Sequence, residues 1–151
     1  MKKIIYYIVG ILGVIILLIA VAGFIKFNFT DGGDILPDQN QTVKYKDLIS
    51  VSNPLASTVI TSPLVIKGEA RGPWFFEASF PVILTDWDGL IIAEGLATAE
   101  GEWMTTDFVP FTATLNFTKP GLGTTGSLIL KKDNPSGLPQ YDDALEIQIK
   151  F

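Results

Sequence analysis

Residues 111 to 118 read FTATLNFT, and residues 145 to 151 read LEIQIKF. In both stretches apolar and polar side chains alternate at every position. Successive side chains of a β-strand point to opposite faces, so a period of two predicts a strand with one buried face. We therefore expect both stretches to be strands that pack against an apolar core.

Less regular runs of the same kind occur elsewhere after residue 47, and none of them keeps a helical period. They span residues 48–52, 64–70, 79–85, 90–96 and 127–132. Seven strands in about 104 residues is the count and size of a constant-type immunoglobulin sandwich. The predicted fold is all-β, an immunoglobulin-like β-sandwich over residues 47–151.

Turn-forming residues fall between these runs. Asp88-Gly89 suits a two-residue hairpin turn, and Lys119-Pro120-Gly121 is expected to end the strand before it. Two prolines, at positions 54 and 63, flank a short segment that we expect to be kinked. These turn-forming residues thus lie between the predicted strands, as a sandwich of short strands requires.

The N-terminal part has a different character. Residues 4–25 read IIYYIVGILGVIILLIAVAGFI and carry no charge. About 20 apolar residues suffice for an α-helix to cross a bilayer. Lys2 and Lys3 precede the run, and this lysine bias predicts that residues 1–3 stay in the cytoplasm and that the rest is extracytoplasmic.

A cleaved signal peptide is the alternative for this run. Cleavage after Ala22 would satisfy the small-x-small rule, but the apolar run exceeds the usual signal-peptide core of about 7 to 15 residues. We therefore favour an uncleaved signal anchor. Residues 26–46 are rich in Gly, Asp, Asn and Gln and are predicted to be a flexible linker.

Composition excludes several classes of function. The sequence has no cysteine and no histidine, which removes thiolate metal sites, disulfides and the usual general base. After the anchor and Lys26, 8 basic residues stand against 16 acidic ones, a formal charge of −8. Such a surface repels phosphate backbones, so nucleic acid is not an expected partner. An exported domain without cystines suits a bacterial envelope.

Further residues resemble a known family. The matching features are Ser52-Asn53-Pro54, SPLVIKGEA at 62–70, Phe76-Glu77, the turn at 86–89, Gly101-Glu102-Trp103 and the strand at 108–117. With them, the stretch from Ile49 through Phe151 resembles the immunoglobulin-like domain first named from bacterial spore germination proteins. The resemblance implies an immunoglobulin-like fold in a membrane-tethered single module, and it implies no catalytic residues.

The segment Pro73-Trp74-Phe75-Phe76-Glu77 is the first candidate binding site. In one interpretation Trp74 or Phe75 is an exposed stacking surface, and Glu77 accepts hydrogen bonds from a sugar or peptide. In the other, which we favour, the rings cap an open end of the sandwich and Glu77 bonds to nearby backbone N–H groups.

Two further tryptophans complete the candidate set. Trp87 is expected to be exposed on the turn Asp86-Trp87-Asp88-Gly89, whose spacing does not match a calcium-binding EF-hand loop. Trp103 is expected to point inward after a turn at Glu100-Gly101-Glu102. Trp74, Phe75, Glu77, Trp87 and Trp103 are thus the candidate ligand-binding residues.

No catalytic motif, metal site or cofactor site is present in the sequence, so we do not expect an enzyme. The predicted function is a membrane-anchored, extracytoplasmic binding module of the bacterial cytoplasmic membrane. Its expected partner is another envelope protein. The alternative is a carbohydrate or peptidoglycan-binding domain that uses exposed aromatic residues.

Overall fold

The structure is a computed structural model, and it describes residues 44–151. The predicted cytoplasmic N-terminus (1–3), the predicted anchor (4–25) and residues 26–43 of the predicted linker lie outside the described residues. Within 44–151, no helix has both the length and the apolar character that a bilayer crossing requires.

Seven strands form from the runs in which apolar and polar residues alternate. They are β1 (Ile49–Asn53), β2 (Leu64–Arg71), β3 (Ser79–Asp86), β4 (Ile91–Ala99), β5 (Phe108–Leu115), β6 (Thr125–Lys131) and β7 (Ala144–Lys150). Two short 3-10 helices, η1 (Gly72–Trp74) and η2 (Pro139–Tyr141), lie between strands. All seven predicted strands are confirmed.

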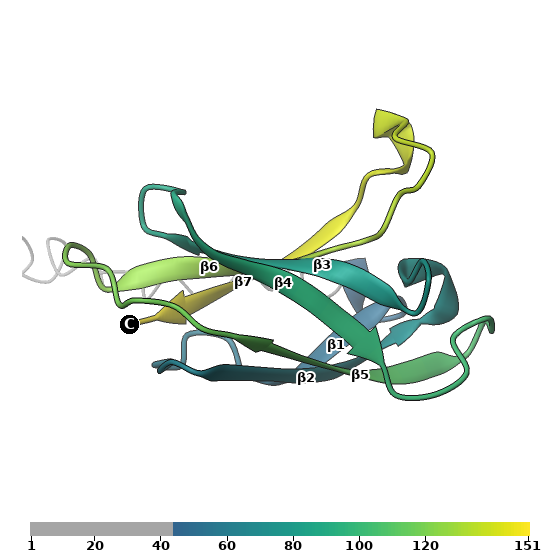
Figure 1. The fold of residues 1–151 in the computed structure, drawn as a ribbon, viewed down its shortest axis with the longest axis horizontal. Coiled ribbons are helices and arrows are strands. Elements are labelled where there is room, and N and C mark those ends of the chain that lie inside the picture. Colours follow the sequence, from purple (N-terminus) through teal and green to yellow (C-terminus); the bar gives the residue numbers. More distant parts are fainter. Residues whose placement is uncertain (1–43) are drawn as a thin grey trace, which may run out of the picture. The chain divides into compact units, whose positions relative to one another are not determined.

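The strands form two layers that are visible in Figure 1. β1, β2 and β5 make one layer, and β4, β3, β6 and β7 make the other, in that order. β4 pairs with β3 over most of its length and with β5 only at Thr98 and Ala99. A constant-type sandwich places its fourth strand in the first layer. Here the fourth strand belongs to the second layer and joins the first at one corner.

A short segment after β1 crosses from one layer to the other. Ile60 N donates to Lys150 O at 2.8 Å, and Lys150 N donates to Thr58 O at 2.9 Å, so residues 57–60 cover the edge of β7. The predicted kinks flank this segment as cis peptide bonds before Pro54 and Pro63. The crossing nearly closes the sandwich, because it leaves β7 without an open edge there.

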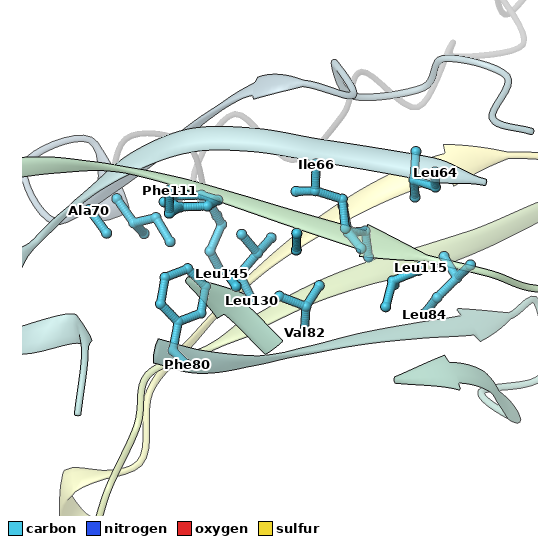
Figure 2. Packing of buried hydrophobic residues seen from close by; sticks show 14 of the residues in the cluster. Leu64, Ile66, Ala70, Phe80, Val82, Leu84, Phe111, Leu115, Leu130 and Leu145 are labelled. Carbon is cyan, nitrogen blue, oxygen red and sulfur yellow. The ribbon is translucent and has the colours of Figure 1, made fainter. Parts of the chain in front are cut away.

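The core lies between the two layers, as Figure 2 shows. Leu64, Ile66 and Ala70 of β2 point inward, while Val65, Lys67 and Glu69 face outward. The rings of Phe75, Phe80 and Phe111 pack in series, with centroids 5.2 Å and 4.9 Å apart. Each large apolar side chain stabilises the fold by about 1.5–3 kcal/mol on burial, and this core takes the place of disulfides in a sequence without cysteine.

Two expectations are corrected by the structure. The turn between β3 and β4 has three residues rather than two, because Asp86 N donates to Leu90 O and Gly89 takes the left-handed conformation with φ 81°. Tyr45, which was placed in the linker, is buried in the core and contacts Trp74. The packed domain therefore extends at least to Tyr45.

The connections gather at two ends of the sandwich (Figure 1). Connections 72–78, 100–107 and 132–143 lie at one end, and the connection 132–143 stands away from the strands. We call this end the projecting end. The turn at 87–89, the connection 116–124 and the C-terminal Phe151 lie at the other end.

Candidate functional site

A pocket of about 400 Å³ opens at the projecting end. It is lined by Leu48, Arg71, Pro73, Trp74, Thr106, Lys132 and Asp143. These residues lie where β2 and β6 end and where β1, β5 and β7 begin. Ligand pockets have volumes of about 300–1,000 Å³, so this one has room for a small group rather than for a long chain segment.

Helix η1 places Trp74 in the pocket wall. Pro73 favours the first turn of a helix, and Phe75 N closes the turn on Gly72 O at 3.0 Å. A Cβ atom at position 72 would overlap the carbonyl oxygens of Trp103 and Thr105. Glycine is therefore required for η1 to lie against residues 103–105.

Trp74 is 2% exposed, and Tyr45 meets it edge to face with ring centroids 6.0 Å apart. Its Nε1 donor is buried and has no hydrogen-bond acceptor among residues 44–151. A buried donor without a partner costs about 1–3 kcal/mol. Trp74 thus lines the pocket with a ring that is almost fully buried and whose donor has no partner among residues 44–151.

Arg71 is held rigidly at the pocket by neutral groups. Its Nε donates to Asp47 O and its Nη1 to Thr106 O, both at 2.9 Å. The guanidinium carbon lies 4.3 Å from the centroid of the Phe108 ring. No carboxylate lies within ion-pair distance of this guanidinium in the described part of the chain, so its positive charge is not neutralised there.

Asp143 is already bound by Tyr45 and Lys44. Lys44 Nζ donates to Tyr45 Oη at 2.6 Å, and Tyr45 Oη donates to Asp143 Oδ1 at 2.5 Å. The hydrogen bond to Tyr45 raises the pKa of Lys44 above its usual value; burial opposes this effect, and attraction to Asp143 adds to it. Lys44 and Asp143, 3.5 Å apart, form the one ion pair of residues 44–151.

Lys132 is the second cation of the pocket. Its backbone N donates to Asp143 O at 2.8 Å, which fixes the start of the connection 132–143. Its ammonium group makes no hydrogen bond or ion pair with residues 44–151. The pocket therefore presents two cations, Arg71 and Lys132, whose charges no neighbouring carboxylate balances.

The structure separates the five residues predicted from the sequence. Phe75 is 4% exposed and packs on Phe80, so neither Phe75 nor Trp74 is an exposed stacking surface. Glu77 is exposed in a turn and makes no side-chain hydrogen bond with the described residues, so the expected bonds to backbone N–H groups are not formed. Of this segment only Pro73 and Trp74 line the pocket.

Trp87 and Trp103 lie elsewhere. Trp87 is 57% exposed, and its ring lies directly on Gly123. The turn between β3 and β4 that carries it lies opposite the projecting end (Figure 1). Trp103 is partly buried against the core, as expected. Arg71, Lys132 and Asp143 were missed, because three isolated charges spread over more than 70 positions form no sequence motif.

Two layers of short antiparallel strands, joined at β4 and nearly closed by the crossing at 57–60, define an immunoglobulin-like domain. A family model described as the immunoglobulin-like domain of bacterial spore germination matches residues 48–137, and the chain belongs to this family. The match confirms the resemblance seen in the sequence. Comparison with curated proteins and with solved structures gave no match.

Proposed function

We propose that this chain is a non-catalytic, membrane-anchored module that presents its projecting end to another protein of the bacterial cell envelope. The pocket at that end is the observation that carries the proposal. Part of its wall comes from the β2–β3 and β6–β7 connections, which correspond by strand order to two of the loops with which immunoglobulin variable domains bind their ligands. The argument from these loops is one of fold analogy.

The proposed location follows from residues 4–25 as a signal anchor with the N-terminus inside. The chain enters the domain at the projecting end, because Tyr45 packs against Trp74 beside the pocket. The predicted linker therefore joins the domain beside the pocket.

The absence of histidine and cysteine from the sequence supports a non-catalytic role. Within residues 44–151, no three potential metal-ligating side chains lie close enough together to hold an ion. Asp143, the one carboxylate of the pocket, is bonded to Tyr45 and Lys44 and lacks a nucleophile to activate.

Carbohydrate or peptidoglycan binding is the second candidate, and the exposed ring of Trp87 is the observation that favours it. An indole held in place by Gly123 is suited to stack on a sugar ring. Titration with N-acetylglucosamine oligomers should then quench tryptophan fluorescence, and Trp87→Ala should abolish the quenching. An unchanged emission would remove this candidate.

Site-specific photo-crosslinking in intact cells tests the main proposal. A photoreactive phenylalanine derivative replaces Tyr141, which is exposed on the projecting connection, in the full chain. The control places it at Leu122, which is exposed on the connection at the opposite end. We expect a discrete adduct with another membrane or envelope protein from position 141 and none from position 122. Equal labelling from both positions, or from neither, would contradict the proposal.

A further inference from the structure

We propose that the pocket at the projecting end binds a short segment of a protein partner in which an acidic residue adjoins an apolar one. The apolar side chain would pack on Leu48 and Pro73, next to Trp74, and the carboxylate would be bound by Arg71 and Lys132. This inference rests on the proposed function, because it names the chemistry by which the module recognises a protein partner.

The apolar half of the pocket sets the first requirement. Leu48 and Pro73 offer exposed carbon surface without charge, whereas Trp74, which is 2% exposed, adds little accessible area. An apolar side chain that covers this surface gains about 25 cal/mol for each Å² removed from water. The volume of about 400 Å³ limits the ligand to one or two side chains of a segment, so recognition is local rather than spread along a groove.

The charged half sets the second requirement. Arg71 is fixed by two carbonyl oxygens and by the Phe108 ring, so it loses little conformational freedom on binding an anion. Arginine also suits planar carboxylates, which it binds with two parallel hydrogen bonds. Lys132 adds a second cation without an intramolecular partner in residues 44–151.

Charge also limits how acidic the ligand can be. Residues 44–151 hold 8 basic residues against 13 acidic ones, so the domain as a whole repels anions. The pocket differs locally, because its only carboxylate, Asp143, is paired with Lys44 and bonded to Tyr45. A single carboxylate next to an apolar residue therefore fits better than a run of acidic residues.

Trp74 provides a reporter for ligand binding in the pocket. The residue lines the pocket, and its buried Nε1 has no acceptor within the described residues. The indole N–H signal therefore comes from the pocket wall and responds to a ligand that binds there.

Peptide titration monitored by NMR tests the inference on the isotope-labelled full chain in detergent micelles. The probes are two end-blocked hexapeptides, Gly-Ser-Leu-Glu-Ser-Gly and the same peptide with Gln in place of Glu. The chain has three tryptophans, so Trp87→Phe and Trp103→Phe assign the indole N–H signal of Trp74. We expect the Glu peptide to shift that signal and to bind about fivefold more tightly than the Gln peptide.

Lys132→Gln should weaken the preference for the Glu peptide, because Arg71 remains as the one cation, and it should not impair folding, because the Lys132 ammonium group has no partner to lose in residues 44–151. Lys131→Gln is the matched control, since Lys131 is exposed on β6, next to Lys132, and does not line the pocket. This variant should keep the preference.

Three results would overturn the inference: equal binding of both peptides, an equal effect of the two lysine variants, or a shift of the Trp74 signal by an N-acetylglucosamine oligomer and not by the peptides. The crosslinking experiment separates this inference from the proposed function. Adducts from position 141 combined with no peptide preference would leave the protein partner in place and reject the acidic segment. Absence of adducts would reject the proposed function itself.

Discussion

The three tryptophans show how far the environment of a residue depends on its neighbours in space. Trp74 is buried beside Tyr45, Trp103 is half-buried against the core, and Trp87 is largely exposed on Gly123. Their positions in turn-rich segments predicted the last two environments. The burial of Trp74 depends on Tyr45, which lies almost thirty positions earlier in the chain.

Substitutions at Trp74 distinguish the contribution of its ring packing to stability from that of its indole N–H donor. Trp74→Ala should lower the free energy of unfolding by about 3–5 kcal/mol, because it leaves a cavity among buried residues. Trp74→Phe keeps an aromatic ring and removes a donor that has no acceptor in residues 44–151, so the loss should not exceed about 1.5 kcal/mol. Urea denaturation followed by circular dichroism measures both. A large loss in Trp74→Phe would mean that Nε1 has a partner after all.

Gly123→Ala is expected to destabilise the domain by about 1–2 kcal/mol and to change the emission of Trp87. The backbone at Gly123 has φ 75°, and a Cβ atom there would overlap the Trp87 ring. Gly121→Ala is the control, because a Cβ atom at position 121 meets nothing within 4 Å. That variant should stay within about 0.5 kcal/mol of the parent. Equal stability of the two variants would show that Trp87 does not lie on Gly123.

At the scale of an element, the turn before β3 is strained. Phe76 and Ser79 exchange backbone hydrogen bonds of 3.0 Å and 3.1 Å, while Glu77 and Ala78 between them have φ of 49° and 63°. This is the backbone of a tight hairpin turn that favours Asn-Gly. Residues other than glycine and asparagine rarely adopt these angles, so the turn stores strain beside η1.

Replacing Glu77-Ala78 by Asn-Gly should therefore raise the free energy of unfolding by about 1 kcal/mol. Thermal and urea unfolding of the double variant measure the gain. The substitution should leave peptide binding in the pocket unchanged, because neither residue lines it. A loss of stability would show that the left-handed angles at these two positions are not those of the folded protein.

The alternation of apolar and polar residues predicted the bounds of some strands more accurately than those of others. β2 and β7 begin and end within one residue of their predicted bounds, since each buries alternate side chains along its length. The strand predicted to reach Phe117 ends at Leu115, because Phe117 leaves the ladder: its N–H bonds to Ser62 Oγ and its ring packs on Phe151. β4 extends to Ala99 because its last residues pair with β5. A contact between the two layers therefore determines where β5 ends and where β4 ends.

At the scale of the whole molecule, the lack of cysteine allows a direct test of location. Lys119→Cys introduces a single thiol on an exposed connection of the full chain. A membrane-impermeant maleimide added to intact cells should label it, because the domain is proposed to lie outside the cytoplasmic membrane. A cytoplasmic cysteine-containing protein of the same cells should stay unlabelled until the cells are opened. Labelling of Lys119→Cys only after lysis would contradict the proposed orientation.

The amino-acid sequence alone determined that this domain is all-β with seven strands and that it belongs to a family of immunoglobulin-like domains. The reason is that alternation and turn residues are local properties, which a strand expresses wherever its partners lie. Only the tertiary structure decided that β4 joins both layers and that a pocket forms at the projecting end. Arg71, Lys132 and Asp143 meet there because three strand ends converge, and convergence depends on the pairing of strands far apart in the chain.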